Sequence, residues 1–293
     1  MPLHNPEISI ISISFNEHRD THEMLESLQK TSQGVDFEVV IVDNGSDIPF
    51  QLNSTYNFHV EVAYSESNLG FSGGNNLGVE KAQGKYLFFL NNDTLVTDNL
   101  ISELKGTLER HPKAVLVSPK IVFHHGEQRL QYAGCTPIDP YFGRGFALGH
   151  NQPNNPSFSK EEPTGRVHGA AMMISKADYL HHGKMEDSFF LYYEEMDFNQ
   201  RVLNAGGEVW YNGRAKVYHK ESATVGKESA LKVYYLFRNR MWFMWRNFGL
   251  IPNVVFAFYI AFLVFPVQLL KRLKAGNKTL VKALIKGFVH GWS

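Results

Sequence analysis

The residues best suited to chemistry follow a short apolar run, residues 87–90, and are Asn91, Asn92 and Asp93. An unbroken apolar run is typical of a parallel strand that is buried on both faces. Ligands of open α/β sheets bind at the carboxyl ends of such strands. Asp93 is the only carboxylate at this end, and its oxygens suit Mn²⁺ or Mg²⁺, with water and a substrate diphosphate as further ligands. The alternative is an Asn-Asp turn that caps the next helix.

Two other predicted strands also end in polar side chains. Residues 8–14 are followed by Asn16 and Glu17, and residues 37–42 are followed by Asp43. Because parallel strands present their carboxyl ends at one edge of a sheet, we expect these side chains to converge with Asp93. A helix cap is the simpler explanation for Asn16 taken alone. The convergence of three strand ends favours a ligand site.

A second group of acids, Glu194, Glu195 and Asp197, follows an aromatic segment, residues 189–193. We expect a helix to begin at about Glu195, and acids in a first helical turn are favourable for the helix dipole alone. Apolar surroundings also raise a carboxyl pKa, which suits a general base. On a helix, Glu194 and Asp197 share a face and Glu195 points about 100° away. One face is therefore available for chemistry while the other supports the helix.

The elements that must position these residues alternate between strands and helices. We expect helices over residues 21–30 and 99–110, and the alternation predicts an α/β fold with a doubly wound, mostly parallel sheet and helices on both faces. Residues 126–163 are rich in Gly, Pro and Asn, and we interpret them as the acceptor side of a site or as a lid. Residues 208–211 are expected to form an edge strand. His219 follows as a metal ligand or phosphate contact, although a lone histidine at a strand end is more often structural.

Composition limits the function classes. The chain has 293 residues and a formal net charge of zero, which gives no indication of nucleic-acid binding. Cys135 is the only cysteine, so an internal disulfide is excluded and a reducing compartment is favoured. We recognise no signal peptide at the start of the sequence.

The last part of the chain has the composition of a membrane-associated segment. Residues 228–248 are aromatic with interleaved arginines, and residues 251–270 contain no charged residue. Lys278, Lys282 and Lys286 then recur at helical spacing beside apolar residues. This pattern favours contact with an anionic membrane surface, by spanning it or by lying in its interface. The alternative is a buried core helix with a solvated tail.

The order of the motifs resembles that of the family 2 glycosyltransferases, and in particular the bacterial rhamnosyltransferase-like enzymes of cell-surface polysaccharide assembly. The resemblance covers residues 7–245. Its motifs are Ser14-Phe15-Asn16-Glu17, Asp43-Asn44-Gly45-Ser46, Asn68-Leu69-Gly70-Phe71-Ser72-Gly73-Gly74-Asn75, Leu90-Asn91-Asn92-Asp93, Gly169-Ala170-Ala171-Met172, Tyr193-Glu194-Glu195-Met196-Asp197, and His219 with Ser222.

The resemblance implies a GT-A fold and an inverting transfer from dTDP-rhamnose or a UDP-sugar. The acceptor would be a hydroxyl of a glycan, free or linked to polyprenyl diphosphate. The implied sites are the catalytic acids Glu195, Glu194 and Asp197, the metal ligands Asp93 and His219, and the nucleotide-sugar residues Ser14, Asn16, Glu17, Asp43, Gly70, Gly74, Asn75 and Asn92. Two departures stand out. Asn91 replaces the first acid of the metal-binding DXD motif, and Glu195 is a Glu where the family's base is an Asp.

The implied organisation is a GT-A catalytic domain over residues 1–227, followed by a membrane-associated helical region over residues 228–293. Within the domain, a nucleotide-sugar half (residues 1–123) precedes an acceptor half (residues 124–227). The enzyme would work at the cytoplasmic face of the cell membrane. Two competing functions are a nucleotidyltransferase and a non-catalytic nucleotide-sugar binder. The segment Phe15-Asn16-Glu17-His18 is not the basic glycine-rich loop that the first would need, and the late acids argue against the second.

Overall fold

The computed structural model describes residues 5–221 and 229–293, so Ser222 of the last motif lies outside the described residues. Within these ranges, ten strands form one sheet in the order β3-β2-β1-β4-β9-β6-β10-β5, with β7 on β6 and β8 on β10. The strands are β1 (Ile8–Ser14), β2 (Phe37–Asn44), β3 (His59–Ser65), β4 (Tyr86–Leu90), β5 (Thr94–Val96), β6 (Ala114–Phe123), β7 (Leu130–Tyr132), β8 (Glu161–Pro163), β9 (Ala171–Ser175) and β10 (Glu208–His219).

The predicted α/β sheet is confirmed, and its two halves differ in strand direction. Strands β3, β2, β1 and β4 are parallel. Beyond them β9 runs antiparallel to both β4 and β6, and β10 is parallel to β6. The parallel half brings the ends of β1, β2 and β4 to one edge, as the polar strand ends require.

Strand β10 differs from its prediction. It continues to His219 and pairs with β6 on one side and with β5 and β8 on the other, so it is not an edge strand. A register shift between Asn212 and Lys216 lets the strand run on through a polar stretch. This continuation carries His219 to the end of β5, opposite Thr94.

Helices cover both faces of the sheet, as the alternation of elements predicts. Helices α1 (His18–Thr31) and α3 (Leu100–Arg110) pack on the face that carries Ile8, Val39 and Phe88. Helices α2 (Gly70–Lys81), α4 (Lys176–His181) and α5 (Glu194–Asn204) pack on the opposite face. Short 3₁₀ turns η1 (Pro156–Phe158) and η2 (Asp187–Phe189) lie in the connections.

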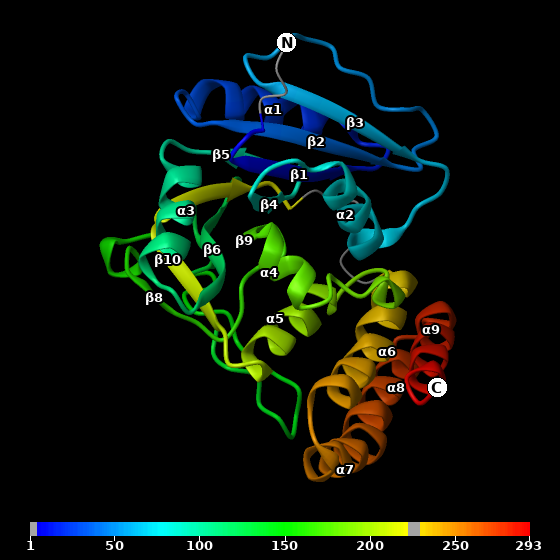
Figure 1. Cartoon of the computed structure of the whole chain (residues 1–293). Coiled ribbons are helices and arrows are strands. Elements are labelled where there is room, and N and C mark those ends of the chain that lie inside the picture. Colours follow the sequence, from blue (N-terminus) through cyan, green and yellow to red (C-terminus); the bar gives the residue numbers. More distant parts are fainter. Residues whose placement is uncertain (1–4, 222–228) are drawn as a thin grey trace.

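The C-terminal helices pack together at one end of the molecule, away from β1–β3 (Figure 1). They are α6 (Ala230–Asn247), α7 (Leu250–Tyr259), α8 (Phe265–Lys274) and α9 (Lys278–His290), and a π-helical turn, η3 (Ile260–Val264), joins α7 to α8. Their buried side chains form a third hydrophobic cluster that also includes Phe189. In the described ranges, one helix, Leu250–Lys274, is long and apolar enough to cross a membrane, and only 17% of its most apolar stretch is buried.

Candidate active site

A cavity of about 300 Å³ lies at the carboxyl ends of β1, β2 and β4. We call it the strand-end cavity. Four of the predicted nucleotide-sugar residues line it, namely Glu17, Gly70, Asn75 and Asn92. Asn44 and Asn68 join them, because the Asn44 amide donates to Asn68 Oδ1 at 3.1 Å and to the Gly70 carbonyl at 3.0 Å. The wall is therefore rich in amides, with apolar surface from Phe15, Phe71 and Phe190.

The other four predicted nucleotide-sugar residues hold the loops that form this wall. Asp43 is buried and accepts hydrogen bonds from the backbone N–H groups of Ser46 (3.1 Å) and Phe50 (2.7 Å). The Asn16 side chain accepts from the Asp47 backbone at 2.9 Å, which ties the loop after β1 to the loop after β2. Ser14 is buried against His18 and Thr21, and a Cβ on Gly74 would lie 2.8 Å from Ile13.

Asp93 and His219 meet at the end of the sheet. His219 Nε2 lies 3.0 Å from Asp93 Oδ1, and His219 Nδ1 lies 2.7 Å from Gln131 Oε1. In the tautomer in which Nδ1–H donates to Gln131, the Nε2 lone pair points toward the Asp93 carboxylate. A histidine that ligates a metal commonly donates its other ring N–H to an oxygen in this way. The pair therefore fits two ligands of one divalent ion.

Among the described side chains, no group of three or more His, Cys, Asp or Glu is assembled for a metal. A divalent ion at this pair would take its remaining ligands from water and substrate oxygens, the arrangement expected for Mg²⁺ with phosphates.

Glu195 lines a second cavity of about 310 Å³, together with Arg144, Arg166 and Tyr193. We call it the Glu195 cavity. Burial raises the pKa of the Glu195 carboxyl, and the nearby Arg166 guanidinium opposes part of that rise. A carboxyl group of this kind in a cavity suits proton abstraction near neutral pH.

The two flanking acids face the protein interior instead. Glu194 is 4% exposed, its Oε2 has no hydrogen-bond partner, and burial together with the neighbouring Glu195 raises its pKa well above the usual range. Asp197 is fully buried and accepts hydrogen bonds from Arg201 (2.9 Å), Arg246 (3.2 Å) and Asn247 (2.7 Å). Asp197 therefore joins α5 to the end of α6.

The two cavities approach each other at Gly169. A Cβ at this position would lie 3.4 Å from Glu195 Cγ and 3.7 Å from the ring of Phe71, which lines the strand-end cavity. Gly169 therefore lies between Glu195 and the Phe71 wall of the strand-end cavity.

The arrangement agrees with a match to a known family. The family model for glycosyl transferase family 2 matches residues 9–176, which is more than half of the chain. The chain belongs to glycosyl transferase family 2. It is a glycosyltransferase.

Curated relatives extend the match. This glycosyltransferase is 28% identical over 241 residues to the low-salt glycan biosynthesis hexosyltransferase Agl10 of Haloferax volcanii, which covers 80% of the chain and 74% of that relative. It is 30% identical over 138 residues to an uncharacterized glycosyltransferase of Haemophilus influenzae, which covers 45% of each protein.

Solved structures share the fold. GalNAc-T7 with UDP, GalNAc and Mn²⁺ matches with a TM-score of 0.61 at 13% identity, over 90% of this glycosyltransferase and 58% of that chain. Residues 1–349 of S. aureus TarS match with a TM-score of 0.60 at 16% identity, over 97% and 80% of the two chains. The predicted GT-A fold is confirmed by these neighbours.

Several site residues of the glycosyltransferase were not foreseen from its sequence. Arg166 and Arg144 reach Glu195 from the 126–166 region, and Gln131 supports His219 from β7. An arginine or glutamine in a stretch without periodicity carries no signal of its own. Asp20, three residues beyond Glu17 on α1, also lines the strand-end cavity, and its helical spacing from Glu17 could have indicated it.

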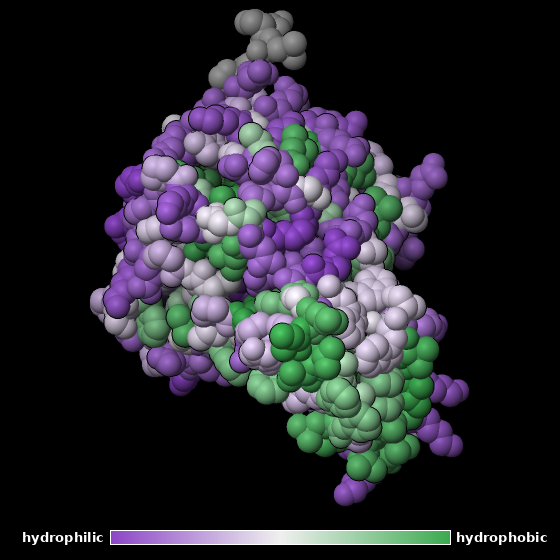
Figure 2. Space-filling view, turned by 60° about the horizontal axis from the view of Figure 1, so that its bottom comes forward, coloured by the Kyte–Doolittle hydropathy of each residue, from purple (hydrophilic) through white to green (hydrophobic). Residues whose placement is uncertain are grey.

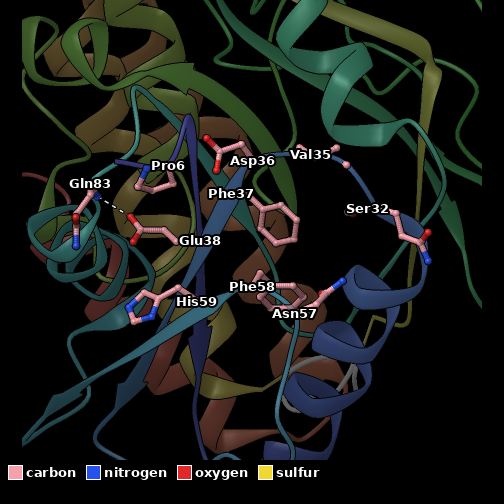
Figure 3. A pocket seen from close by; sticks show the side chains of 12 residues that line it. Pro6, Ser32, Val35, Asp36, Phe37, Glu38, Asn57, Phe58, His59 and Gln83 are labelled. Carbon is pink, nitrogen blue, oxygen red and sulfur yellow. Dashed lines mark hydrogen bonds between the residues drawn. The ribbon is translucent and has the colours of Figure 1, made fainter. Parts of the chain in front are cut away.

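A larger cavity of about 490 Å³ lies at the other end of β2, between this strand, β3 and the turn after α1 (Figure 3). Phe37 and Phe58 pack against each other in its wall, with ring centroids 4.8 Å apart, and the buried Glu38 accepts from the Gln83 backbone at 2.6 Å. Its lining includes none of the predicted site residues of the glycosyltransferase. The strand-end and Glu195 cavities are therefore the candidate active site.

Proposed function

We propose that this glycosyltransferase moves a hexosyl group from dTDP-rhamnose or a UDP-sugar to a hydroxyl of a glycan in cell-surface polysaccharide synthesis, and that the acceptor glycan is carried on polyprenyl diphosphate. The observation that carries the proposal is the position of Glu195. Its side chain lines the Glu195 cavity, and Gly169 lies between it and Phe71 in the wall of the strand-end cavity. The similarity to a hexosyltransferase of glycan biosynthesis supports the same reaction class.

In the proposed reaction the donor occupies the strand-end cavity and the acceptor hydroxyl enters the Glu195 cavity. Glu195 takes the proton of that hydroxyl as its oxygen attacks the anomeric carbon and the bond to the diphosphate breaks. The transition state resembles the oxocarbenium ion of glycoside hydrolysis. A single displacement from the opposite face inverts the anomeric centre.

We propose that Asp93 and His219 bind a divalent ion, Mn²⁺ or Mg²⁺. The 3.0 Å distance between His219 Nε2 and Asp93 Oδ1 supports this assignment. Such an ion would offset the negative charge that the leaving diphosphate gains. Asn91 and Asn92 line the cavity beside Asp93, where their amides would bind neutral oxygens of the donor.

We also propose that residues 228–293 hold the catalytic domain, residues 1–227, at the cytoplasmic face of the membrane. The support is the mostly exposed helix Leu250–Lys274 with its two exposed cations at the end, Lys271 and Lys274. Cations at the boundary of an apolar helix are attracted by the anionic inner leaflet.

The test combines nucleotide binding with product analysis. Calorimetry with UDP, dTDP and GDP, with and without Mn²⁺, should identify the base, and NMR of the product should show an inverted anomeric centre. Asp93→Ala should remove the metal dependence of nucleotide binding and abolish transfer, whereas Asp98→Ala, at an exposed acid nearby, should change neither. Nucleotide binding without transfer to any acceptor would indicate a non-catalytic binder. Unchanged metal-dependent binding by Asp93→Ala would refute the metal assignment.

A further inference from the structure

A third cavity, of about 370 Å³, lies between α6, α8 and α9. We call it the basic cavity. Four cationic side chains line it, Arg144, Lys232, Arg240 and Arg272, and its lining contains no Asp or Glu. Four like charges around one cavity repel one another, and an anion placed among them relieves that repulsion. The chemistry of the lining therefore fits a ligand with more than one negative charge.

The basic cavity is continuous with the active site. Arg144, Tyr193 and Leu236 line both it and the Glu195 cavity. Arg240 lines the basic cavity, and its guanidinium donates to the Phe142 carbonyl and lies over the rings of Phe256 and Tyr259. Its Nε is buried without a hydrogen-bond partner. A buried guanidinium with an unpaired N–H is costly, and an anion in the adjoining cavity would offset part of that cost through its charge.

The far wall of the basic cavity is formed by the helix Leu250–Lys274, whose outer face is apolar. Val264, Gln268 and Arg272 follow at intervals of four residues and line the cavity. Leu263, Val267 and Leu270 on the same helix are 56–60% exposed. Figure 2 shows hydrophobic residues gathered over these C-terminal helices, with hydrophilic side chains at their rim.

The charge of this part of the chain is one-sided. Residues 229–293 contain ten Lys or Arg residues and no Asp or Glu, although the whole chain has 29 of each sign. An exposed apolar helix beside unbalanced cations fits an anionic lipid surface better than it fits a protein partner. The basic cavity thus opens between an acceptor site and a surface suited to lipid.

We propose that the basic cavity binds the phosphate groups of a lipid-linked acceptor. The hydrocarbon chain of this acceptor leaves along the exposed face of α7 and α8, and its sugar hydroxyl reaches Glu195. Guanidinium groups suit the site because each can donate two parallel hydrogen bonds to phosphate oxygens. This inference rests on the proposed function and adds the site that binds the phosphate groups of the acceptor's carrier.

The test uses farnesyl diphosphate, an amphiphile with a diphosphate and a short apolar chain, and the full-length protein in nanodiscs. The Lys232→Gln/Arg240→Gln double variant removes two charges from the basic cavity. The Lys113→Gln/Lys160→Gln double variant removes two exposed charges outside the C-terminal helices and is the matched control. Farnesol and inorganic pyrophosphate separate the contributions of chain and phosphate, and saturating nucleotide blocks the strand-end cavity.

We expect farnesyl diphosphate to bind in the presence of saturating nucleotide and more tightly than farnesol or pyrophosphate. The cavity variant should weaken this binding at least about tenfold, since each charge-assisted hydrogen bond to phosphate contributes more than a neutral one. The Lys113→Gln/Lys160→Gln variant should retain it. Equal affinity in both variants, equal affinity for farnesol, or complete competition by nucleotide would each overturn the proposal. Nucleotide binding by the same proteins reports separately on the proposed function.

Discussion

Glu194 and Glu195 are adjacent carboxyl groups that have different surroundings at the start of α5. Glu195 lines a cavity beside Arg166, whereas Glu194 is buried with one oxygen that no donor reaches. Burial raises the pKa of both groups, and only Glu195 has a guanidinium, that of Arg166, to oppose the rise. Neighbouring carboxyl groups with different pKa values commonly have different roles in an active site. The geometry gives Glu195 access to substrate and leaves Glu194 inside.

Glu195→Gln should leave the fold and nucleotide binding intact and slow transfer by about 10²-fold or more, because a general base contributes at least that much. Single-turnover transfer at saturating donor and acceptor measures the change. Wild-type activity should fall as the pH drops through the raised pKa of Glu195, above the usual carboxyl range. A near-normal rate in Glu195→Gln would show that another group is the base.

Glu194→Gln should stabilise the protein at neutral and alkaline pH. The pKa of Glu194 is raised in the fold, so the folded protein keeps a proton that the unfolded chain releases, and stability falls as pH rises through this window. A glutamine side chain does not ionise, so the Glu194→Gln variant avoids this loss of stability. The loss amounts to roughly 1.4 kcal/mol for each unit by which the fold raises the pKa. Denaturant unfolding of both proteins between pH 4 and 8 should show the difference growing with pH. A constant difference would contradict the assignment.

The residues at strand ends could be predicted because their position follows from a local pattern. Asn92, Asp93 and Glu17 follow apolar runs, and a parallel sheet must bring such ends together. Gln131 and Arg166 could not be predicted, since they reach the site from strands and loops whose place depends on long-range pairing. Some strand-end residues line the cavity, as Asn92 does, and others hold a loop in place, as Asp43 does. The difference depends on hydrogen bonds that a sequence does not show.

At the level of elements, the segment before α5 has an uncommon backbone. Phe190, Tyr192 and Tyr193 have φ angles of 63°, 67° and 76°, a region that residues other than glycine rarely occupy. Asn239 on α6 holds this segment, because its amide donates to the carbonyls of Phe189, Leu191 and Tyr192 at 2.7–2.9 Å. Helix α6 thereby sets the direction from which the chain enters α5 and places Glu195.

Asn239→Ala should therefore slow transfer while nucleotide binding persists. The carbonyls of Leu191 and Tyr192 lose the Asn239 donor, whereas that of Phe189 keeps the Leu191 backbone N–H and Arg238. The loss should cost about 1–3 kcal/mol of stability. The kcat should fall more than the affinity for nucleotide, which a merely destabilised site would not show. Asn253→Ala is the control, because Asn253 is also buried but donates to one carbonyl, that of Phe248. Equal loss of activity in both variants would refute a positioning role for Asn239.

The sequence predicts most elements of the sheet but not the length or neighbours of β10. Residues 208–211 have the apolar pattern of a strand. The pattern stops at the polar residues Asn212, Arg214 and Lys216, so it does not predict that the strand continues. Strand β5 is only three residues long and directly follows the turn that begins at Asn91, so it is too short for a periodic pattern to indicate it. The pairing of these two strands is a long-range event, and it is what brings His219 to Asp93.

For the whole molecule, the C-terminal helices share one hydrophobic cluster, which Ile138 and Phe189 of the preceding part of the chain also join. Phe237 and Met241 of α6 pack with Leu280 and Leu284 of α9 in one hydrophobic cluster. Removing the chain after α6 would expose this cluster. Substitution of exposed residues is therefore the cleaner way to test membrane contact.

Phe258→Ser/Phe262→Ser should weaken binding to phosphatidylglycerol-containing vesicles about tenfold or more, because each buried Phe side chain contributes roughly 1.5–3 kcal/mol. The two rings are 62% and 75% exposed, so the change should leave the thermal midpoint nearly unaltered. Ile48→Ser/Leu52→Ser, at exposed apolar positions of the catalytic domain, is the control. Vesicle flotation measures the effect, and a large fall in the midpoint would show instead that the helix is part of the core.

The uneven distribution of charge has a practical consequence for handling the protein. A chain with a formal net charge of zero is not expected to bind a charged resin near neutral pH. Resins, however, contact one face at a time, and ten cations lie in the last 65 residues without a single acid. The detergent-solubilised protein should therefore be retained on heparin or phosphocellulose and elute early in a salt gradient. Such retention would reflect the cations of its C-terminal helices and should not be mistaken for affinity for DNA or RNA.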